Sequence, residues 1–304
     1  RAPHSASQPQ AWQASVGAKP RRLMKTSTWW PAVRVSSMAS MTGGQLKGQN
    51  SMKYILKLFD STLEKLDSSK RLITTLNAHS YNTLQEDKVF SEALKSSDIL
   101  LPDGVSMVWA SRVLLGKKIK KIAGDDLFYF EMNRVQNKGG SCFFLGSTFE
   151  TLKIIKERAK IEFPDVKVHY YSPPYKAEFS EKDSATMINA VNRVKPDTLF
   201  IGLTAPKQEK WAYQHFDKLE AEHICCIGAV FDFYAGTVNR APKWMISIGM
   251  EWFYRLIKEP KRMWKRYVIG NPLFVKNIIS KKINLIRDNQ YDIDLVESRD
   301  ILQK

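Results

Sequence analysis

The chain has 304 residues, a net charge of +16, 43% hydrophobic residues and 26% charged residues. This composition is typical of a globular protein with one large or two smaller domains, and it excludes collagen-like, disordered and disulfide-scaffold chains. No apolar run is long enough to span a bilayer. Cys142, Cys225 and Cys226 are too few for a disulfide framework or a four-cysteine zinc site, so we expect a reduced, intracellular setting.

Residues 1–51 differ in composition from the rest of the chain. They hold seven Lys or Arg residues and no acid, are rich in Ser, Ala, Gln, Pro and Gly, and show no sustained periodicity. Residues 38–45 read MASMTGGQ, which resembles the phage-capsid leader that expression vectors use as an epitope tag. We therefore interpret residues 1–51 as a vector-derived or otherwise non-native, disordered leader; a basic targeting peptide is the weaker alternative.

From residue 71 onward, short apolar runs alternate with amphipathic stretches. Six runs have the length, composition and flanking turn residues that are typical of strands: 71–77, 98–103, 141–146, 166–172, 198–203 and 223–229. Two stripes at helical spacing lie between strands: Leu152, Ile155, Ala159 and Phe163, and then Ala185, Ile188, Val191 and Val194. This alternation predicts an α/β catalytic domain over residues 52–239. We expect a Rossmann-like, mostly parallel sheet with helices on both faces.

After Pro242 the pattern becomes helical only, and Pro242, Pro260 and Pro272 each suit the start of a helix. Residues 240–287 hold twelve Lys or Arg residues against two acids, interleaved with Trp, Phe and Tyr. We interpret them as a basic, aromatic-rich helical appendage that associates with an anionic membrane surface. A nucleic-acid face and a solvated basic surface are the alternatives, and residues 288–304 form a separate acidic tail.

Polar residues follow the ends of the predicted strands, where ligands bind in parallel α/β sheets. Thr75 and Asn77 follow the first strand, and Asp103 with Gly104 follows the second. Asp103 lies between an apolar strand and an apolar helix predicted over residues 105–115, so partial burial would raise its pKa and suit it to general base catalysis. A capping or turn role is the plainer reading of the same residue.

Six further residues are candidates for the site. Asp125 and Asp126 fit either helix capping or the site, and we favour capping for at least one. Lys207 and Gln208 begin a helix, where they add donors to an anion site. Gly146 fits a phosphate-binding turn or a tight turn, and Asp232, flanked by aromatics, fits sugar binding or a structural turn; these four readings are evenly matched.

The sequence lacks several signatures of cofactor and metal chemistry. No Walker loop, GxGxxG, HxxxH or CxxC pattern occurs, so a P-loop NTPase and a dinucleotide oxidoreductase are disfavoured. We expect no cofactor and no metal. If the chain is a nucleotide-sugar enzyme, Arg and Lys would then supply the positive charge that the leaving diphosphate of the donor needs. Arg255, Arg262, Lys265 and Arg266 recur at a spacing that places them near one helix face.

Taken together, six segments resemble the WecG/TagA/CpsF family of bacterial glycosyltransferases (glycosyltransferase family 26). They are TLNAHSYN, LLPDGVSMVWAS, AGDDLF, GLTAPKQEKW, GAVFDFYAGTVNRAPKW and GMEWFYRLIKEPKRMWKRY, in this order between residues 72 and 267. The resemblance implies an inverting, metal-independent transfer of a sugar from a UDP-sugar to a polyprenyl-diphosphate-linked sugar. It also implies a place in cell-surface polysaccharide biosynthesis (teichoic acid, capsule, O-antigen or exopolysaccharide), on the cytoplasmic, inner face of the bacterial membrane.

The same resemblance assigns roles residue by residue. Asp103 in PDG corresponds to the general base, Thr75 and Asn77 in TxN to the active-site strand end, and Gln208 in APKQEKW to an active-site glutamine. Arg255, Arg262 and Lys265 correspond to the basic positions of the appendage that closes over the diphosphate, with Arg266 as the neighbour that can replace Lys265. The remaining substrate-binding candidates are Gly104, Asp125, Asp126, Gly146, Lys207 and Asp232.

Two alternatives belong to other classes. A basic α/β nucleic-acid-binding protein would use residues 240–287, but these helices carry many large apolar residues and no nucleic-acid-binding signature, so we expect no nucleic-acid partner. A membrane-associated scaffold without catalysis would tolerate Asp103→Asn. The sequence leaves open the sugar donated, the acceptor sugar, the linkage, the polysaccharide, whether the chain forms a homo-oligomer and the role of the tail.

Overall fold

The computed structural model describes residues 58–287, so the predicted leader and acidic tail lie outside the described residues. The sheet has six strands: β1 (Arg71–Leu76), β2 (Ile99–Pro102), β3 (Ser141–Gly146), β4 (Lys167–Tyr171), β5 (Thr198–Gly202) and β6 (His223–Cys226). Their spatial order is β2-β1-β6-β5-β3-β4, and every pairing is parallel. Each strand coincides with a predicted one to within three residues at either end, which confirms the parallel sheet.

Helices alternate with these strands along the chain. They are α1 (Ala78–Glu86), α2 (Lys88–Lys95), α3 (Val105–Leu115), α4 (Gly124–Lys138), α5 (Phe149–Glu162), α6 (Glu181–Asn192), α7 (Lys207–His215) and α8 (Val230–Ala235), with short 3-10 turns at Leu63–Lys65 and Phe216–Lys218. Side chains of Asn77, Asp87, Thr148 and Ser180 cap α1, α2, α5 and α6 by accepting backbone N–H groups. Capping explains why these helices begin where they do.

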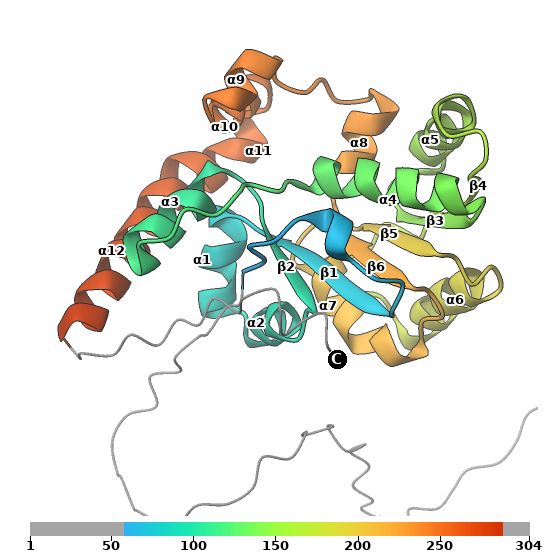
Figure 1. The fold of residues 1–304 in the computed structure, drawn as a ribbon, viewed down its shortest axis with the longest axis horizontal. Coiled ribbons are helices and arrows are strands. Elements are labelled where there is room, and N and C mark those ends of the chain that lie inside the picture. Colours follow the sequence, from blue (N-terminus) through green and yellow to red (C-terminus); the bar gives the residue numbers. More distant parts are fainter. Residues whose placement is uncertain (1–57, 288–304) are drawn as a thin grey trace, which may run out of the picture. The chain divides into compact units, whose positions relative to one another are not determined.

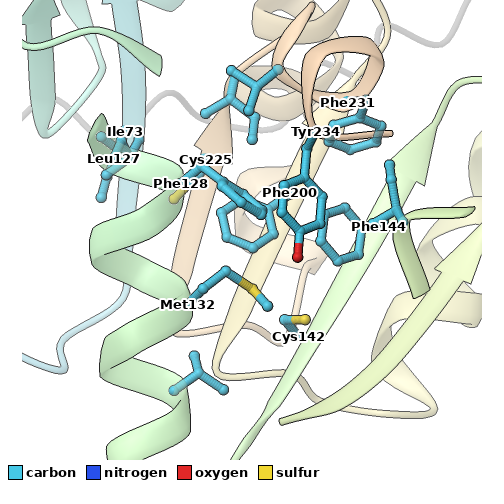
Figure 2. Packing of buried hydrophobic residues seen from close by; sticks show 14 of the residues in the cluster. Ile73, Leu127, Phe128, Met132, Cys142, Phe144, Phe200, Cys225, Phe231 and Tyr234 are labelled. Carbon is cyan, nitrogen blue, oxygen red and sulfur yellow. The ribbon is translucent and has the colours of Figure 1, made fainter. Parts of the chain in front are cut away.

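Helices cover both faces of the sheet (Figure 1). On one face, α4, α5 and α8 pack over an aromatic cluster that includes Phe128, Phe144, Phe200 and Tyr234 (Figure 2). On the other face, α6 and α7 pack over a second cluster built around Trp211 and the strands. The strands are apolar over nearly their whole length because both faces are buried, and this confirms the Rossmann-like fold.

The structure confirms the first predicted apolar stripe and corrects part of the second. In α5, Leu152, Ile155 and Ala159 are fully buried, as predicted. In α6 the buried residues are Ser184, Met187, Ile188 and Val191, whereas Ala185 is exposed and Val194 lies beyond the helix. The predicted stripe was therefore wrong in part, because it included Ala185 and omitted Ser184. Ser184 is polar but can be buried, because its hydroxyl accepts a hydrogen bond from the indole of Trp211 at 3.2 Å.

A buried polar network closes the amino end of the sheet. Glu131 of α4 contacts His223 Nδ1 at 2.7 Å, accepts a hydrogen bond from Thr198 at 2.7 Å and pairs with Arg134 at 2.9 Å. These hydrogen bonds lower the pKa of Glu131 despite its burial. The three cysteines are buried and free, which agrees with the expected absence of a disulfide framework.

The C-terminal segment is helical, with α9 (Lys243–Ser247), α10 (Glu251–Lys258), α11 (Pro260–Trp264), a π-helical segment (Lys265–Ile269) and α12 (Gly270–Arg287). Pro260 begins α11, as predicted, and Pro242 caps α9 from the position before it. Pro272 does not begin a helix, because it lies within α12. The π-helical segment directly precedes α12 and provides a wider turn, in which Gly270 N–H reaches back to the carbonyl of Lys265.

Helix α12 has one buried side and one exposed apolar side. Phe274 and Ile278 are fully buried, and the ring of Phe274 meets that of Tyr81 edge-on at 5.3 Å. Asn82 of α1 donates a hydrogen bond to the carbonyl of Gly270 at 2.7 Å. The exposed large apolar side chains within residues 243–287 are Trp244, Ile248, Trp252, Phe253, Ile257, Trp264, Val268, Ile269, Leu273, Val275, Ile279, Ile283 and Ile286. None of the helices within residues 58–287 is long and apolar enough to cross a membrane.

Candidate functional site

Asp103 lies at the carboxyl end of the sheet. It follows β2, and its N–H donates a hydrogen bond to the carbonyl of Leu76 at the end of β1, at 2.9 Å. Gly104 comes next with a φ of 98°, a conformation that suits glycine, and it precedes the first residue of α3. The backbone therefore turns sharply here and fixes the Asp103 carboxyl beside the neighbouring strand end.

The surroundings of Asp103 shift its acidity toward neutrality. Burial and, to a smaller extent, the nearby carboxylate of Glu251 together raise the pKa of Asp103 from 3.8 to about 6, against the opposing charges of Lys121 and Arg266. Lys121 reaches this place because Ile122 N–H bonds to the carbonyl of Pro102 at 3.0 Å. A carboxyl with this pKa is largely ionised near neutral pH and still basic enough to accept a proton.

Three guanidinium groups from the C-terminal helices, those of Arg255, Arg262 and Arg266, lie close enough to repel one another electrostatically, and Arg266 is close enough to interact with Asp103. Burial lowers the pKa of Arg266, and the positive charges of Arg255 and Arg262 lower it further, while Tyr267 and Asp103 act the other way. The Nε atoms of Arg255 and Arg266 are buried and have no hydrogen-bond partner among the described residues. Arg262 is exposed and pairs with Glu259 at 2.7 Å. Like charges with unused donors make this cluster suited to an anion.

Lys265 and Arg266 point to different surroundings. Arg266 is the side chain whose charge acts on Asp103, whereas Lys265 is exposed and lines a groove with His79 and Asn82. Burial and, to a smaller extent, the charge of Arg266 together lower the pKa of His79 to about 4. Of the two basic residues, Arg266 therefore has the position that the candidate site needs.

Gln208 also lies at the carboxyl end of the sheet, where it follows β5, three strand positions away from β2 and Asp103. It is the second residue of α7, is 3% exposed, and donates a hydrogen bond from Nε2 to Glu209 Oε1 at 2.8 Å. Its Oε1 is buried without a partner among the described residues. The carboxamide lies against Gly228 after β6, where an added Cβ would meet Oε1 at 3.4 Å.

Thr75 lies on β1, and Asn77 follows the strand directly. Thr75 is 9% exposed and pairs in register with Leu101 of β2, one residue before the strand ends. The Oδ1 of Asn77 accepts the N–H of Ser80 at 3.1 Å and so caps α1. Capping therefore uses the side-chain oxygen of Asn77.

Asp125 and Asp126 have separate partners at the start of α4. Asp126 Oδ2 accepts the N–H of Ala123, the residue before α4, at 2.7 Å, so Asp126 caps the start of this helix. Asp125 forms a two-point ion pair with Arg240, in which Nη2 lies 3.0 Å from Oδ1. Arg240 also pairs with Glu251 at 3.3 Å, so it ties α4 to α10 beside Asp103.

The other three candidates have mixed surroundings. Gly146 has a φ of 128°, and an added Cβ there would collide with the carbonyl of Gly202, so the backbone requires glycine without any ligand. The Nζ of Lys207 donates to the carbonyl of Lys176 at 2.8 Å, beyond β4 and at the opposite edge of the sheet from Asp103. Burial raises the pKa of Asp232, and the charges of Arg262 and Arg255 oppose this, so Asp232 lies close to the arginine cluster.

Four residues near the site went unnoticed in the sequence: Lys121, Glu209, Arg240 and Glu251. Lys121 lies in a lysine-rich run, which is typical of a solvent-exposed segment. Glu209 lies in the first turn of a helix, where acidic side chains are usually exposed. Only the pairing of Asp125 with Arg240, 115 residues apart, reveals the role of the latter. Within the described residues, no three His, Cys, Asp or Glu side chains are grouped as a metal site requires.

Comparison with known proteins places this geometry in a family. The sequence profile described as "Glycosyl transferase WecG/TagA/CpsF family" matches residues 45–288. A Bacillus subtilis (strain 168) protein named N-acetylglucosaminyldiphosphoundecaprenol N-acetyl-beta-D-mannosaminyltransferase is 30% identical over 70% of this chain and 80% of its own. The Bacillus spizizenii protein of the same name is 30% identical over 77% of this chain and 91% of its own.

A Staphylococcus aureus (strain MW2) protein of that name is 24% identical over 69% of this chain and 80% of its own. The family profile extends over all six strands and the C-terminal helices, including Asp103, Gln208 and the arginine cluster. With the strand-end carboxyl, the buried glutamine and the arginines all inside the matched region, this chain belongs to the WecG/TagA/CpsF family of glycosyltransferases.

Proposed function

We propose that the chain transfers a hexose of the N-acetylmannosamine type from a UDP-sugar to a sugar on polyprenyl diphosphate, with inversion and without a metal. The names of the relatives support the acceptor and the sugar, because they specify N-acetylglucosaminyl-diphosphoundecaprenol and N-acetylmannosamine. The product belongs to the synthesis of a cell-surface polysaccharide. Residues 52–239 form the catalytic domain in this proposal, and residues 240–287 form the membrane-associating appendage.

The observation that carries the proposal is the proximity of a base to an anion site. The Asp103 carboxyl, with its raised pKa, experiences the charge of Arg266, whose Nε has no partner among the described residues. A sugar transfer from a nucleotide needs both functions: one group accepts a proton from the attacking hydroxyl, and another stabilises the departing diphosphate.

The strand order gives the site enough length for an extended nucleotide sugar. Asp103 follows β2 and Gln208 follows β5, and three strand spacings separate β2 from β5. At roughly 4.8 Å per spacing this is about 14 Å. We place the diphosphate at the end with Arg255 and Arg266, and hydroxyl-bearing parts of the substrates along the strand ends toward Gln208.

The reaction is a single displacement. Asp103 accepts the proton of the acceptor hydroxyl while its oxygen attacks the anomeric carbon, and the bond from that carbon to the diphosphate oxygen breaks. UDP leaves with the bonding electrons. Arg255, Arg262 and Arg266 stabilise its negative charge in the role that a divalent cation plays in other transferases.

The exposed apolar side chains of the C-terminal helices support a peripheral membrane location. Trp264, Val268, Ile283 and Ile286 are each at least 46% exposed, on helices that also carry many Lys and Arg residues. Aromatic and aliphatic side chains next to basic ones suit the headgroup region of an anionic leaflet. Here we place the lipid-linked acceptor, on the cytoplasmic side where UDP-sugars are available.

The test is a calorimetric titration of the full chain with UDP, with NAD as the control ligand, in the presence of nanodiscs that contain anionic lipid. We expect UDP to bind and NAD not to bind. Arg266→Gln should weaken UDP binding by about 10-fold or more, because it removes a charge-assisted contact worth about 1.5–3 kcal/mol. Lys153→Gln removes the same charge from an exposed position on α5, and should leave UDP binding unchanged.

Transfer is then measured by mass spectrometry, with UDP-N-acetylmannosamine as donor and N-acetylglucosaminyl-diphosphoundecaprenol as acceptor. A product heavier by one N-acetylhexosamine supports the proposal, and Asp103→Asn should abolish it. Absence of UDP binding by the unmodified chain would overturn the donor assignment. Salt-dependent binding of nucleic acid in its place would favour the alternative class.

A further inference from the structure

Glu209 is a buried acid without a cation. It is the third residue of α7 and only 1% exposed, and no Lys, Arg or His within residues 58–287 forms an ion pair with it. Burial raises the pKa of Glu209 to about 7, and its hydrogen bonds to Gln208 and to its own backbone N–H only partly offset this. Cys226 of β6 is close enough for the carboxyl to act on its thiol. Burying an acid here costs free energy that an apolar side chain would not.

The carboxyl of Glu209 fixes the orientation of a neighbouring amide. A glutamine carboxamide presents donors on one side and an acceptor on the other, and a rotation of 180° exchanges them. Because Glu209 Oε1 accepts a hydrogen bond from Gln208 Nε2 at 2.8 Å, the amide nitrogen faces Glu209. The amide oxygen is buried and without a partner among the described residues, and the carboxamide as a whole lies against Gly228 at the end of β6.

An unpartnered buried carbonyl oxygen is suited to a donor from a ligand. A diphosphate at neutral pH offers acceptors almost exclusively, whereas sugar hydroxyls offer donors. The Gln208 end of the site is therefore suited to a hydroxyl, and the arginine end is suited to the diphosphate. If the amide of Gln208 were free to rotate, it would present its nitrogen to the ligand for part of the time.

We propose that Glu209 is a positioning residue, whose carboxyl holds the Gln208 carboxamide so that Oε1 accepts a hydrogen bond from a substrate hydroxyl. This inference rests on the proposed glycosyl transfer, in which Gln208 touches the substrate. In this proposal Glu209 acts through Gln208, and because Glu209 Oε2 is also buried without a partner among the described residues, the double variant below separates this role from direct contact with the substrate. Its role is distinct from that of Asp103, which lies three strands away and exchanges the proton.

The experiment compares Glu209→Leu, Glu209→Gln, Gln208→Ala and the double variant Gln208→Ala with Glu209→Leu. Glu209→Leu should lower kcat/KM for transfer about 10-fold, the equivalent of one lost hydrogen bond, without lowering the melting temperature. Glu209→Gln keeps a carbonyl oxygen that accepts from Gln208, so its kcat/KM should stay close to that of the unmodified chain. In the Gln208→Ala background, Glu209→Leu should cause no further loss.

Each other outcome overturns the inference. If Glu209→Leu transfers as well as the unmodified chain, Gln208 does not need its neighbour. If Glu209→Leu causes the same loss with and without Gln208, or if Glu209→Gln fails to preserve transfer, Glu209 acts by another route. If the unmodified chain itself transfers no sugar, the proposed function fails and this inference fails with it, and this result is distinct from the first two.

Discussion

Replacing Asp103 by Asn should make the protein more stable and far less active. The carboxyl of Asp103 is ionised at neutral pH although it is partly buried and faces Glu251, so the folded state loses free energy when the proton leaves. The pKa rises from 3.8 to about 6, and at 1.36 kcal/mol per unit this loss is about 3 kcal/mol at most. Asn occupies nearly the same volume and carries no charge.

The gain in stability should depend on pH with a defined sign. Below about pH 4 both the folded and the unfolded chain hold the proton, and the Asp103→Asn variant should have no advantage. Between about pH 4 and pH 6 the unfolded chain ionises first, so the unmodified protein loses stability as pH rises. Above pH 7 the variant should be more stable by about 1–3 kcal/mol, or by several degrees in melting temperature for a fold of this size.

Activity should move in the opposite direction. Loss of the base should lower kcat by about 100- to 10,000-fold, which is the usual contribution of general base catalysis. In the unmodified chain, kcat/KM should fall about tenfold per pH unit below pH 6, because only the ionised carboxyl accepts a proton. Urea denaturation at pH 4 and pH 7.5, with transfer assays across pH 5–8, measures both effects. An Asn variant that is less stable at pH 7.5, or that keeps the rate of the unmodified chain, would refute the reasoning.

Three further predictions concern the frame around the site. Glu131→Leu should destabilise the fold by about 3–5 kcal/mol in urea denaturation at neutral pH, because it leaves the buried partners of Glu131 without their carboxylate. Lower pH should diminish this difference, because the pKa of Glu131 is lowered in the folded state and its stabilising contribution is lost as the pH falls through that pKa. Gly146→Ala should lower the melting temperature clearly, at a cost of about 2 kcal/mol or more, because the positive φ and the Gly202 carbonyl leave no room for a methyl group; unchanged stability would argue against the turn described here. Replacing both Ile283 and Ile286 by Glu should weaken co-sedimentation with anionic vesicles while UDP binding in solution is retained, and equal losses in both assays would contradict a separate membrane-facing side.

The sequence was sufficient to predict the sheet and most of the strand-end candidates. Strands buried on both faces must be apolar along their length, and the turns that follow them must be polar, so both signals are local. Asp103 belongs to this class, because an Asp-Gly turn after an apolar run is visible without any tertiary information. Whether each candidate contacts a substrate is a separate matter, which the experiments above address.

The choice between Lys265 and Arg266 depends on structure that no local pattern specifies. A π-helical segment covers both residues, and its wider turn changes which side of the following helix faces the core. Regular helical spacing alone therefore does not decide which of the two side chains lies near Asp103. Glu209 was missed for a related reason, since its burial comes from the packing of α7 against the sheet and a first-turn acid is ordinarily solvated.

The order of strands in the sheet constrains how the protein is made. β1 is completed on one side by β2, which follows it closely, but on the other side by β6, with Ile73 opposite Cys225 and about 150 residues between them. At a synthesis rate of about 5–20 residues per second, the nascent chain holds this central strand edge unpaired for roughly 8–30 seconds. The strand ends that carry Asp103 and Gln208 thus come together only after β6 has emerged, and α12 then covers Tyr81 last of all. A ribosome-bound chain that stops before β6 should therefore present an exposed, aggregation-prone edge to the chaperones of the cell.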